Sequence, residues 1–536
     1  MPKNKTKAPT KAKSPTKTKV KTKAPKKQDD QFCNPYHFVP AVPIEETSLE
    51  QQQHWLCVQD DFKKRKEDYR YDHSRYYADS KTCYSGRIIC KLTAEEPFFI
   101  GASNKREAND KQDISAIVAP FELDGKPAIP ASTLRGLLSS IVEAASNSTL
   151  RVLNNDQYHS IMIADRNNGY KPKYPNAGGD TYDFFERIDP ELIPFHKERM
   201  FLSPAELLFG FVQKDDDDKN SKKAGLALAG RVQLSFGLLA PEEPKPYYEY
   251  PDSKDGQGRL LKVLGSPQLP CPMMYFKNRY TEGKAYKYIT KTDFNLDKHI
   301  PQGRKMYVHS HRDNGKEPWK SLDDKNNKHL KVMVNPIRQD ATFYFHVDFE
   351  NLDEWELGLL CYALRPTNEF RHKLGMGKSI GLGTIRIDPI GLFLIDRQTR
   401  YQTKDIFKTT RYHQTWVDTK NWPPPESMYE RERTEHELPA TKKEESWQDF
   451  RDIYFVDTMH EDIKQALELL GNPDKVSAKV HTPQVAGKEK EEMERETYAW
   501  YGENENHRHK MLLPLYRESQ EIPSLTRWHK TQGSKK

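Results

Sequence analysis

The stretch that decides the fold of this chain is HKLGMGKSIGLGTIRI, which runs from His372 to Ile387. Its four glycines allow the backbone to turn tightly and to approach a ligand without Cβ atoms in between; they are Gly375, Gly377, Gly381 and Gly383. The last four residues have the β-branched character of a strand. The pattern predicts a tight loop that leads directly into a strand, and a plain turn between two elements is the alternative interpretation.

Positive side chains accompany this loop. Lys378 lies between the second and third glycines, and Arg371 and Lys373 lie just upstream, which suits the binding of phosphate groups. A Walker loop would need glycine at position 372, which is His372. A dinucleotide fingerprint would need glycine or alanine at position 380, which is Ile380. The spacing therefore excludes both common nucleotide motifs.

The length and the charge distribution indicate how the rest of the chain is organised. The 536 residues are enough for two or three domains, but 30% are charged and only 35% are hydrophobic, which predicts long polar insertions. Residues 1–28 contain eleven lysines and no acid, leaving 74 basic against 78 acidic residues elsewhere. We expect residues 1–30 to form a disordered basic tail with affinity for nucleic acid phosphates, or a solvated tail without a specific role.

The remaining composition indicates a protein of the cytoplasm. Six cysteines are scattered without a CxxC pair, as expected for reduced thiols, and we predict no structural metal site. His309 and His311 are expected to be surface histidines. No run of 18 apolar residues is present and the N-terminus has no apolar signal region, so we expect neither a membrane span nor secretion.

The first elements expected are a strand, a hairpin and a helix. Alternating apolar residues predict the strand at 86–93, although Ile89 interrupts the alternation. An apolar segment at 114–121 turns at 124–127 into a second short strand, which predicts the hairpin. The helix begins at residue 131, where we expect Ser132 or Thr133 as the cap. Arg135 in its first turn predicts a phosphate site, and an ordinary exposed arginine is the alternative.

Further along, the patterns predict strands at 229–236, 342–349 and 384–387, and a helix that starts near Leu352 with one apolar face and stops before Pro366. The order strand, helix, strand, strand, helix, strand is that of a ferredoxin-like α+β fold, the architecture of RNA-recognition domains. The predicted organisation is a connection at 34–85, a core at 86–390 with insertions at 147–200 and 241–336, and an extension at 391–536 with a helix near 459–470.

Four motifs in this order resemble a known family. They are Phe98-Phe99-Ile100-Gly101-Ala102-Ser103, Ile129-Pro130-Ala131-Ser132-Thr133-Leu134-Arg135-Gly136, Leu208-Phe209-Gly210 followed by Gly230-Arg231, and the glycine loop. Together they resemble the RAMP superfamily of CRISPR-associated proteins, and in particular the insertion-bearing backbone subunit of type III effector complexes. The resemblance covers about residues 86–140, 200–240 and 335–390.

The resemblance implies a protein that holds guide RNA beside related RAMP-type subunits and lets target RNA pair with it. Together with the loop and helix arguments it predicts these RNA contacts: Ser132, Thr133, Arg135, Arg231, Arg371, Lys373, Gly375, Gly377, Lys378, Gly381 and Gly383. Many family members also cut target RNA with a loop aspartate, which here implies Asp113 or Asp110, with Mg²⁺ as the cofactor. Two other functions stay open: a non-catalytic structural or capping subunit, and a stand-alone nuclease that processes guide precursors.

Overall fold

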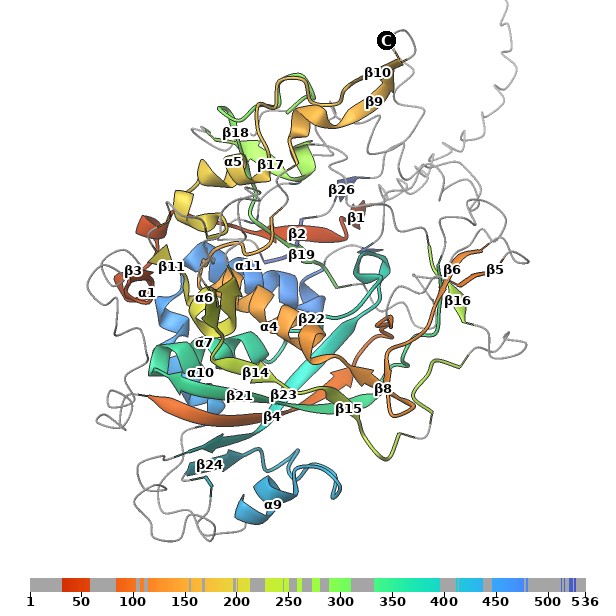
Figure 1. Cartoon of the computed structure of the whole chain (residues 1–536), viewed down its shortest axis with the longest axis vertical. Coiled ribbons are helices and arrows are strands. Elements are labelled where there is room, and N and C mark those ends of the chain that lie inside the picture. Colours follow the sequence, from red (N-terminus) through yellow and green to blue (C-terminus); the bar gives the residue numbers. More distant parts are fainter. Residues whose placement is uncertain are drawn as a thin grey trace, which may run out of the picture. The chain divides into compact units, whose positions relative to one another are not determined.

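The largest sheet of the computed structural model has nine strands, and Figure 1 shows it below the helices α4 (Ala131–Ala145) and α7 (Glu354–Leu364). Its strand order is β22-β23-β4-β21-β15-β8-β7, with β14 also pairing with β21 and β24 with β23. The strands are β4 (Tyr84–Ala94), β7 (Glu122–Leu123), β8 (Lys126–Ile129), β14 (Val232–Leu234), β15 (Gly237–Leu239), β21 (Thr342–Leu352), β22 (His372–Lys373), β23 (Thr384–Leu394) and β24 (Gln414–Val417). The predicted strands at 86–93, 342–349 and 384–387 are confirmed, and so is the mixed α and β class.

The structure describes most of the chain in separate ranges. They are 31–57, 83–102, 107–109, 114–153, 156–165, 169–195, 199, 201–212, 227–243, 245–249, 258–262, 272–279, 289–309, 332–395, 411–412, 414–436, 446–476, 479–480, 512, 515, 520–523 and 525–526. The expected tail at 1–30 lies outside them. Gln31–Lys536 forms one compact unit, and β23 runs past residue 390, where we expected the core to end.

Both faces of β4 are buried, and this explains the interrupted alternation in its sequence. Ile88, Cys90 and Leu92 belong to the main hydrophobic core. Ile89 points to the opposite face and packs in a second cluster with Tyr344 and Phe393. A strand that is covered on both sides needs apolar residues at consecutive positions.

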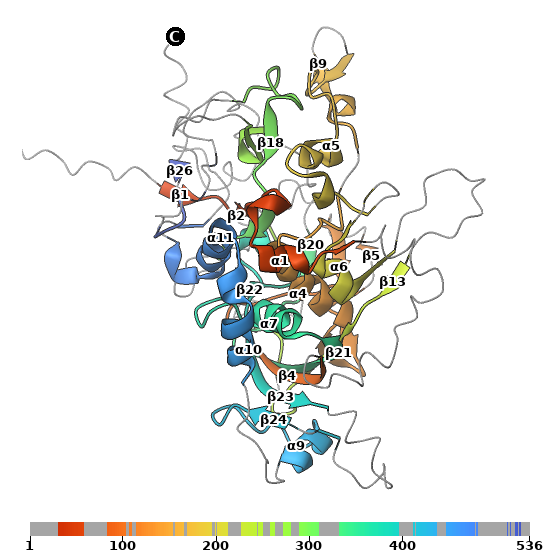
Figure 2. The ribbon, with the colours of Figure 1, turned by 90° about the vertical axis from the view of Figure 1, so that its left-hand side faces the viewer.

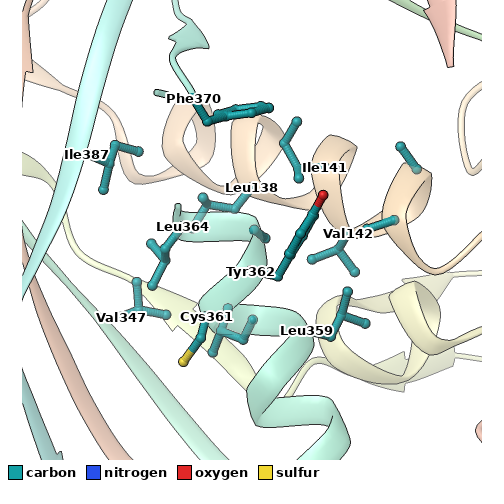
Figure 3. Close-up of a cluster of buried hydrophobic side chains, with 14 of the residues drawn as sticks. Leu138, Ile141, Val142, Val347, Leu359, Cys361, Tyr362, Leu364, Phe370 and Ile387 are labelled. Carbon is teal, nitrogen blue, oxygen red and sulfur yellow. The ribbon is translucent and has the colours of Figure 1, made fainter. Parts of the chain in front are cut away.

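Two helices, α4 and α7, pack on one face of the sheet. Outside them, α10 (Trp447–Tyr454) packs on α7 and α11 (Glu461–Gly471) on α4. In α7 every residue from Trp355 to Leu364 is buried, not only one face as expected. The reason is that α10 packs against α7 in addition to α4 and the sheet. Figure 3 shows Tyr362 and Leu364 of α7 among core side chains of α4, such as Ile141.

The start of α4 differs from the expectation. The helix begins at residue 131 as predicted, but the residue before it is Pro130, which has no capping side chain. Ser132 and Thr133 lie inside the first turn and do not cap it, so that part of the prediction is wrong. The fixed φ of Pro130 and its carbonyl, which accepts from the Thr133 N–H at 3.0 Å, start the helix instead.

The second face of the sheet is covered by the segment that leads into α9 (Glu430–His436), because Tyr412, Trp422 and Tyr429 pack in the cluster of Ile89 and Phe393. Figures 1 and 2 show α9 on the side away from α7. Arg87 of β4 holds α9 in place, because its guanidinium contacts Asp348 at 2.7 Å and Glu432 at 3.0 Å. The Tyr412 hydroxyl donates to the same Glu432 at 2.6 Å. Residues 418–436, together with Tyr412, therefore serve as the second cover of the sheet.

The predicted strand at 229–236 is not continuous. Val232 in β14 lies opposite Phe349, whereas Leu238 in β15 lies opposite Tyr344, so six residues here correspond to five along β21. Ser235 lies at the change of register and keeps its contact to β21 through the carbonyl of His346, at 3.0 Å. An extra residue of this kind bends a strand. The bend lets β15 pair with β8 on its other side.

The two predicted insertions meet in a separate aromatic cluster. Tyr174 and Phe184 of the first insertion pack with Phe276 and Phe294 of the second, and Phe38 joins them from the N-terminal segment. Phe184 and Phe294 are stacked with ring centroids 4.9 Å apart. Residues that are far apart in the sequence thus share one apolar core.

The remaining elements are short. The smaller sheets have the orders β16-β20-β6-β5 and β25-β1-β26, and the pairs are β3 with β11, β2 with β19, β9 with β10, β12 with β13, and β17 with β18. These strands are β1 (Gln31–Cys33), β2 (Tyr36–Val39), β3 (Leu56–Cys57), β5 (Glu107–Asn109), β6 (Ile114–Val118), β9 (Met162–Asp165), β10 (Gly169–Pro172), β11 (Phe201–Leu202), β12 (Gly210–Val212), β13 (Ala227–Ala229), β16 (Arg259–Leu260), β17 (Phe276–Asn278), β18 (His299–Pro301), β19 (Arg304–Tyr307), β20 (Val332–Val334), β25 (Lys479–Val480) and β26 (Leu525–Thr526). The short helices are α1 (Leu49–Gln53), α5 (Thr181–Glu186) and α6 (Pro204–Phe209). Within the described ranges, no helix has the length and apolar character needed to cross a membrane.

Candidate nucleic-acid interface

The glycine loop between β22 and β23 docks on the segment that follows β4. The Met376 N–H donates to the Phe99 carbonyl at 2.9 Å, and the Gly383 N–H donates to the Pro97 carbonyl at 2.9 Å. All four glycines have positive φ, with values of 78° at Gly375, 71° at Gly377, 109° at Gly381 and 89° at Gly383. A Cβ at Gly375 would lie 2.2 Å from the Phe99 carbonyl oxygen. Gly375 is therefore required by this internal contact, whether or not a ligand approaches the loop.

The cations beside the loop have different surroundings. Arg371 forms an ion pair with Glu95 at 2.7 Å. Lys373 is buried, its ammonium donates to the Leu382 carbonyl at 3.1 Å, and burial lowers its pKa to about 7. Lys378 is half-buried, and burial lowers its pKa as well. Of the three predicted contacts, Lys378 is the one whose side chain has neither an ion pair nor a hydrogen bond among the described residues.

The first turn of α4 is the second predicted phosphate site. The first N–H groups bonded to the Pro130 carbonyl are those of Thr133 and Leu134, at 3.0 and 3.2 Å. The N–H groups of residues 131 and 132 therefore have no acceptor within the helix. Arg135 is exposed, and its guanidinium donates to the Phe209 carbonyl at the end of α6. The turn thus presents backbone donors and one guanidinium together.

The guanidinium of Arg231 is bound to other groups of the protein. It forms an ion pair with Glu356 of α7 and donates to the carbonyl of Asn351 at 2.8 Å and to that of Leu207 at 3.2 Å. These contacts connect α6, the start of β14 and α7. The sequence pattern that placed Arg231 among the RNA contacts does not reveal these partners, because they lie 24 to 125 positions away.

The predicted catalytic aspartates, Asp110 and Asp113, lie outside the described residues. The residues that flank them are described: Asn109 pairs with Ile114 in the antiparallel contact of β5 and β6. β6 in turn pairs in parallel with β20, whose Val334 packs with Ile380 and Leu382 of the glycine loop. The flanks of the predicted catalytic loop thus belong to a small sheet that contacts the glycine loop.

No metal centre is formed by the described part of the chain. It contains no group of three or more histidine, cysteine, aspartate or glutamate side chains that could hold a metal ion. Among the described cysteines, the buried Cys90 and Cys361 are free thiols. The Mg²⁺ expectation therefore depends on Asp110 and Asp113 and stays a prediction.

Comparison with known families decides the class of protein. The model of the RAMP superfamily matches residues 91–386, which is more than half of the chain. The chain belongs to the RAMP superfamily. The matched span begins in β4 and ends in β23, so it includes the first turn of α4 and the glycine loop.

Solved structures show more distant similarities to this RAMP protein. One is a chain of a type IV-B CRISPR complex, with 12% identity, a TM-score of 0.25, and coverage of 56% of this chain and 89% of that chain. Another is Csc2 of Thermofilum pendens, with 10% identity, a TM-score of 0.24, and coverage of 58% and 66%. Among curated proteins, none matches this sequence.

One histidine of the RAMP protein was misjudged from the sequence. His309, expected at the surface, is only 1% exposed. Its ring nitrogens lie 3.2 Å from the Thr384 hydroxyl and 3.0 Å from the Arg371 carbonyl. Burial, with Lys373 nearby, holds its pKa well below the usual range. His309 thus joins the second insertion to the start of the glycine loop, and His311 lies outside the described residues.

The RAMP protein is expected to lose stability in acid partly through His372. Burial lowers its pKa to about 4, with Arg371 acting in the same direction, and its Nε2 lies 3.0 Å from the Leu364 carbonyl. Below pH about 6.5 the unfolded chain binds a proton that the folded chain rejects until pH about 4, so the free energy of unfolding falls across this window, by about 3 kcal/mol. Urea unfolding of His372→Asn should show a flatter pH dependence between these values.

The control for this experiment is His159→Asn, because His159 is exposed. That variant should keep the wild-type pH dependence. Burial also lowers the pKa of His309, so the His372→Asn variant should keep part of the dependence of the unfolding free energy on pH. If His372→Asn and wild type have the same slope, His372 does not stay neutral in the folded protein.

Proposed function

We propose that this RAMP protein is a guide-RNA-binding subunit of a type III CRISPR ribonucleoprotein complex that presents guide RNA to target RNA. The observation that carries the proposal is that the matched family span contains two elements with donors for a ligand: the first turn of α4, whose N–H groups at 131 and 132 precede the helical hydrogen bonds, and Lys378 on the docked glycine loop. Contacts of this kind bind phosphates, which are the same for every base sequence. They suit a subunit that accepts any guide sequence.

We further propose that its core is ferredoxin-like. The relevant strands occur in the sheet in the order β23, β4, β21 and β14 with β15, and all neighbours are antiparallel. In chain order this is fourth, first, third and second. Both connecting helices, α4 and α7, belong to one hydrophobic core with the sheet. These features support the split βαβ arrangement of that fold.

The surroundings of the predicted contacts divide them into two groups. Ser132, Thr133, Arg135 and Lys378 are exposed or half-exposed and are the residues that we propose as direct RNA contacts. Arg231 and Arg371 form ion pairs with carboxylates and Lys373 is buried, so we assign them the role of holding the elements in place. The four glycines shape the loop through their positive φ values.

Replacing Lys378 and Arg135 by Gln should weaken guide RNA binding and make it less sensitive to salt. Each phosphate contact that is lost should reduce the slope of log Kobs against log salt by about 1. Fluorescence anisotropy of a labelled guide RNA over a salt series measures this. Lys298→Gln, an exposed lysine of the second insertion, is the control and should keep the wild-type slope. Unchanged slopes in both variants would show that the RNA path lies elsewhere.

Asp113 is proposed as the residue for target cleavage, with Mg²⁺ as the cofactor. In the assembled complex, Asp113→Ala should abolish at least one target cleavage product while guide RNA stays bound, and Asp110→Ala should have the smaller effect. Gel analysis of a labelled target RNA distinguishes these results. If every product survives in both variants, the subunit is non-catalytic, and its role is structural.

The partners are tested by purification from the native host. We expect a short guide RNA and several related RAMP-type subunits to copurify with this protein. A chain that purifies alone and cuts precursor transcripts would instead be the stand-alone processing nuclease. Incubation of the purified protein with precursor RNA reveals that activity directly.

A further inference from the structure

A polar cavity of about 410 Å³ lies where β23, β24 and the start of α10 meet. Arg386 and Asp388 of β23, Trp416 of β24 and Trp447 of α10 form its walls. None of its lining residues is among the RNA contacts proposed above. Its volume is within the range of small-ligand sites, which is about 300–1,000 Å³.

Positive groups outnumber carboxylates in this cavity. Arg365 and Arg386 both bind the buried Asp388, at 2.6 and 2.8 Å, and Arg386 also lies 3.8 Å from Glu95, which is outside the lining. Lys420 adds a third cation, which is exposed, and Asp418 is the second carboxylate of the lining.

The start of α10 adds backbone donors to the same wall. Trp447 and Gln448 are its first two residues, and the Phe450 N–H is bonded to the Ser446 carbonyl at 3.3 Å. The N–H groups of residues 447 and 448 therefore precede the helical hydrogen bonds and lie at the positive end of the helix dipole. Together with the guanidiniums they favour an anion such as phosphate.

Trp416 adds a different kind of surface, whereas Trp447 belongs to the main hydrophobic core and is only 2% exposed. Trp416 is half-buried, and Arg451 lies over the ring of Trp447 with its guanidinium carbon 4.9 Å from the ring centroid. Indole rings and guanidinium planes are the groups on which proteins stack unpaired nucleobases. A simple phosphate site would have no use for them.

We propose that this cavity binds a single nucleotide, with its phosphate at Arg365, Arg386 and Lys420 and its base against Trp416. The nucleotide is either a free mononucleotide or the unpaired end of an RNA, and both present the same chemistry. This inference is independent of the RNA path proposed for Lys378 and Arg135. It gives the extension at 411–476 a binding role in addition to covering the core.

The test is calorimetry of the full chain with AMP, UMP and inorganic phosphate, and with a single-stranded octanucleotide carrying a 5′-phosphate. We expect AMP or the octanucleotide to bind, and Lys420→Glu and Trp416→Leu to weaken that binding about tenfold or more, a loss of about 1.4 kcal/mol per tenfold. Lys298→Glu is the matched control and should bind as wild type does. Lys420→Glu should leave the unfolding midpoint unchanged because Lys420 is exposed.

The outcomes separate the sources of the nucleotide. Binding of AMP assigns the site to free nucleotides, and binding of the octanucleotide alone assigns it to an RNA end. Where AMP binds, Lys378→Gln should not affect its affinity; where the octanucleotide alone binds, Lys420→Glu and Trp416→Leu should weaken its binding. Either result distinguishes this site from the proposed RNA path. The proposal is overturned if neither ligand binds, if Lys420→Glu and Trp416→Leu both bind as wild type does, or if inorganic phosphate binds as tightly as AMP.

Discussion

Glu206→Ala is expected to lower the free energy of unfolding by about 3–5 kcal/mol, because it removes the partner of a buried charge. The side chains of Arg199 and Glu206 are 0% and 1% exposed, and two guanidinium nitrogens lie 2.9 Å from the two carboxylate oxygens. Glu206 also accepts hydrogen bonds from the N–H and hydroxyl of Ser203, which start α6. Its loss therefore affects both the ion pair and the helix start.

This ion pair connects the first insertion to the core. Arg199 belongs to the insertion and also contacts Glu191 at 3.1 Å, whereas Glu206 belongs to α6. Urea unfolding at pH 7 measures the effect. Glu249→Ala is the control, because Glu249 and its partner Lys245 are exposed, and it should leave the midpoint unchanged. Equal midpoints for the two variants would mean that the buried pair does not form in solution.

Gly375→Ala should cost about 2–4 kcal/mol, the sum of an unfavourable left-handed residue and the lost docking of the loop. Gly375 has a φ of 78°, and an added Cβ would lie 2.2 Å from the carbonyl oxygen of Phe99. The same oxygen accepts the Met376 N–H at 2.9 Å, so the loop has to leave Phe99 to relieve the clash. Chemical denaturation gives the change in stability.

Gly136→Ala provides the matched comparison. Gly136 lies in α4, and a Cβ at this position would meet no atom within 4 Å. Alanine should stabilise the helix there by up to about 1 kcal/mol. The two glycine variants thus change stability in opposite directions. If Gly375→Ala is as stable as wild type, the loop does not dock on Phe99 in solution.

The helix from 131 and the long strands were predictable because their patterns are local. Phe343, Phe345 and Val347 of β21 are fully buried, and this alternation is visible in the sequence alone. The break between β14 and β15 was not predictable in the same way. It depends on the register against β21 and on the second pairing with β8, and neither is encoded within residues 229–236.

The sequence predicted the two elements of the site but not the partners and burial of its charged side chains. The first turn of α4 and the glycine loop are formed where they were expected, and the positive φ values agree with the glycine pattern. The sequence did not indicate that Arg371 would pair with Glu95 or that Lys373 would be buried. The cavity beside Trp447 was missed as well, because its walls come from residues 365 to 448.

By itself, the sequence of this protein indicated the long strands and the two main helices of its core, and the positions where glycine follows a left-handed backbone. These properties depend on side-chain periodicity and on φ, which are local. The tertiary structure alone decided which cations have internal partners and which remain available to a ligand. A buried charge needs an opposite charge or a hydrogen bond close in space, and Glu95 reaches Arg371 across 276 positions of the chain only after folding.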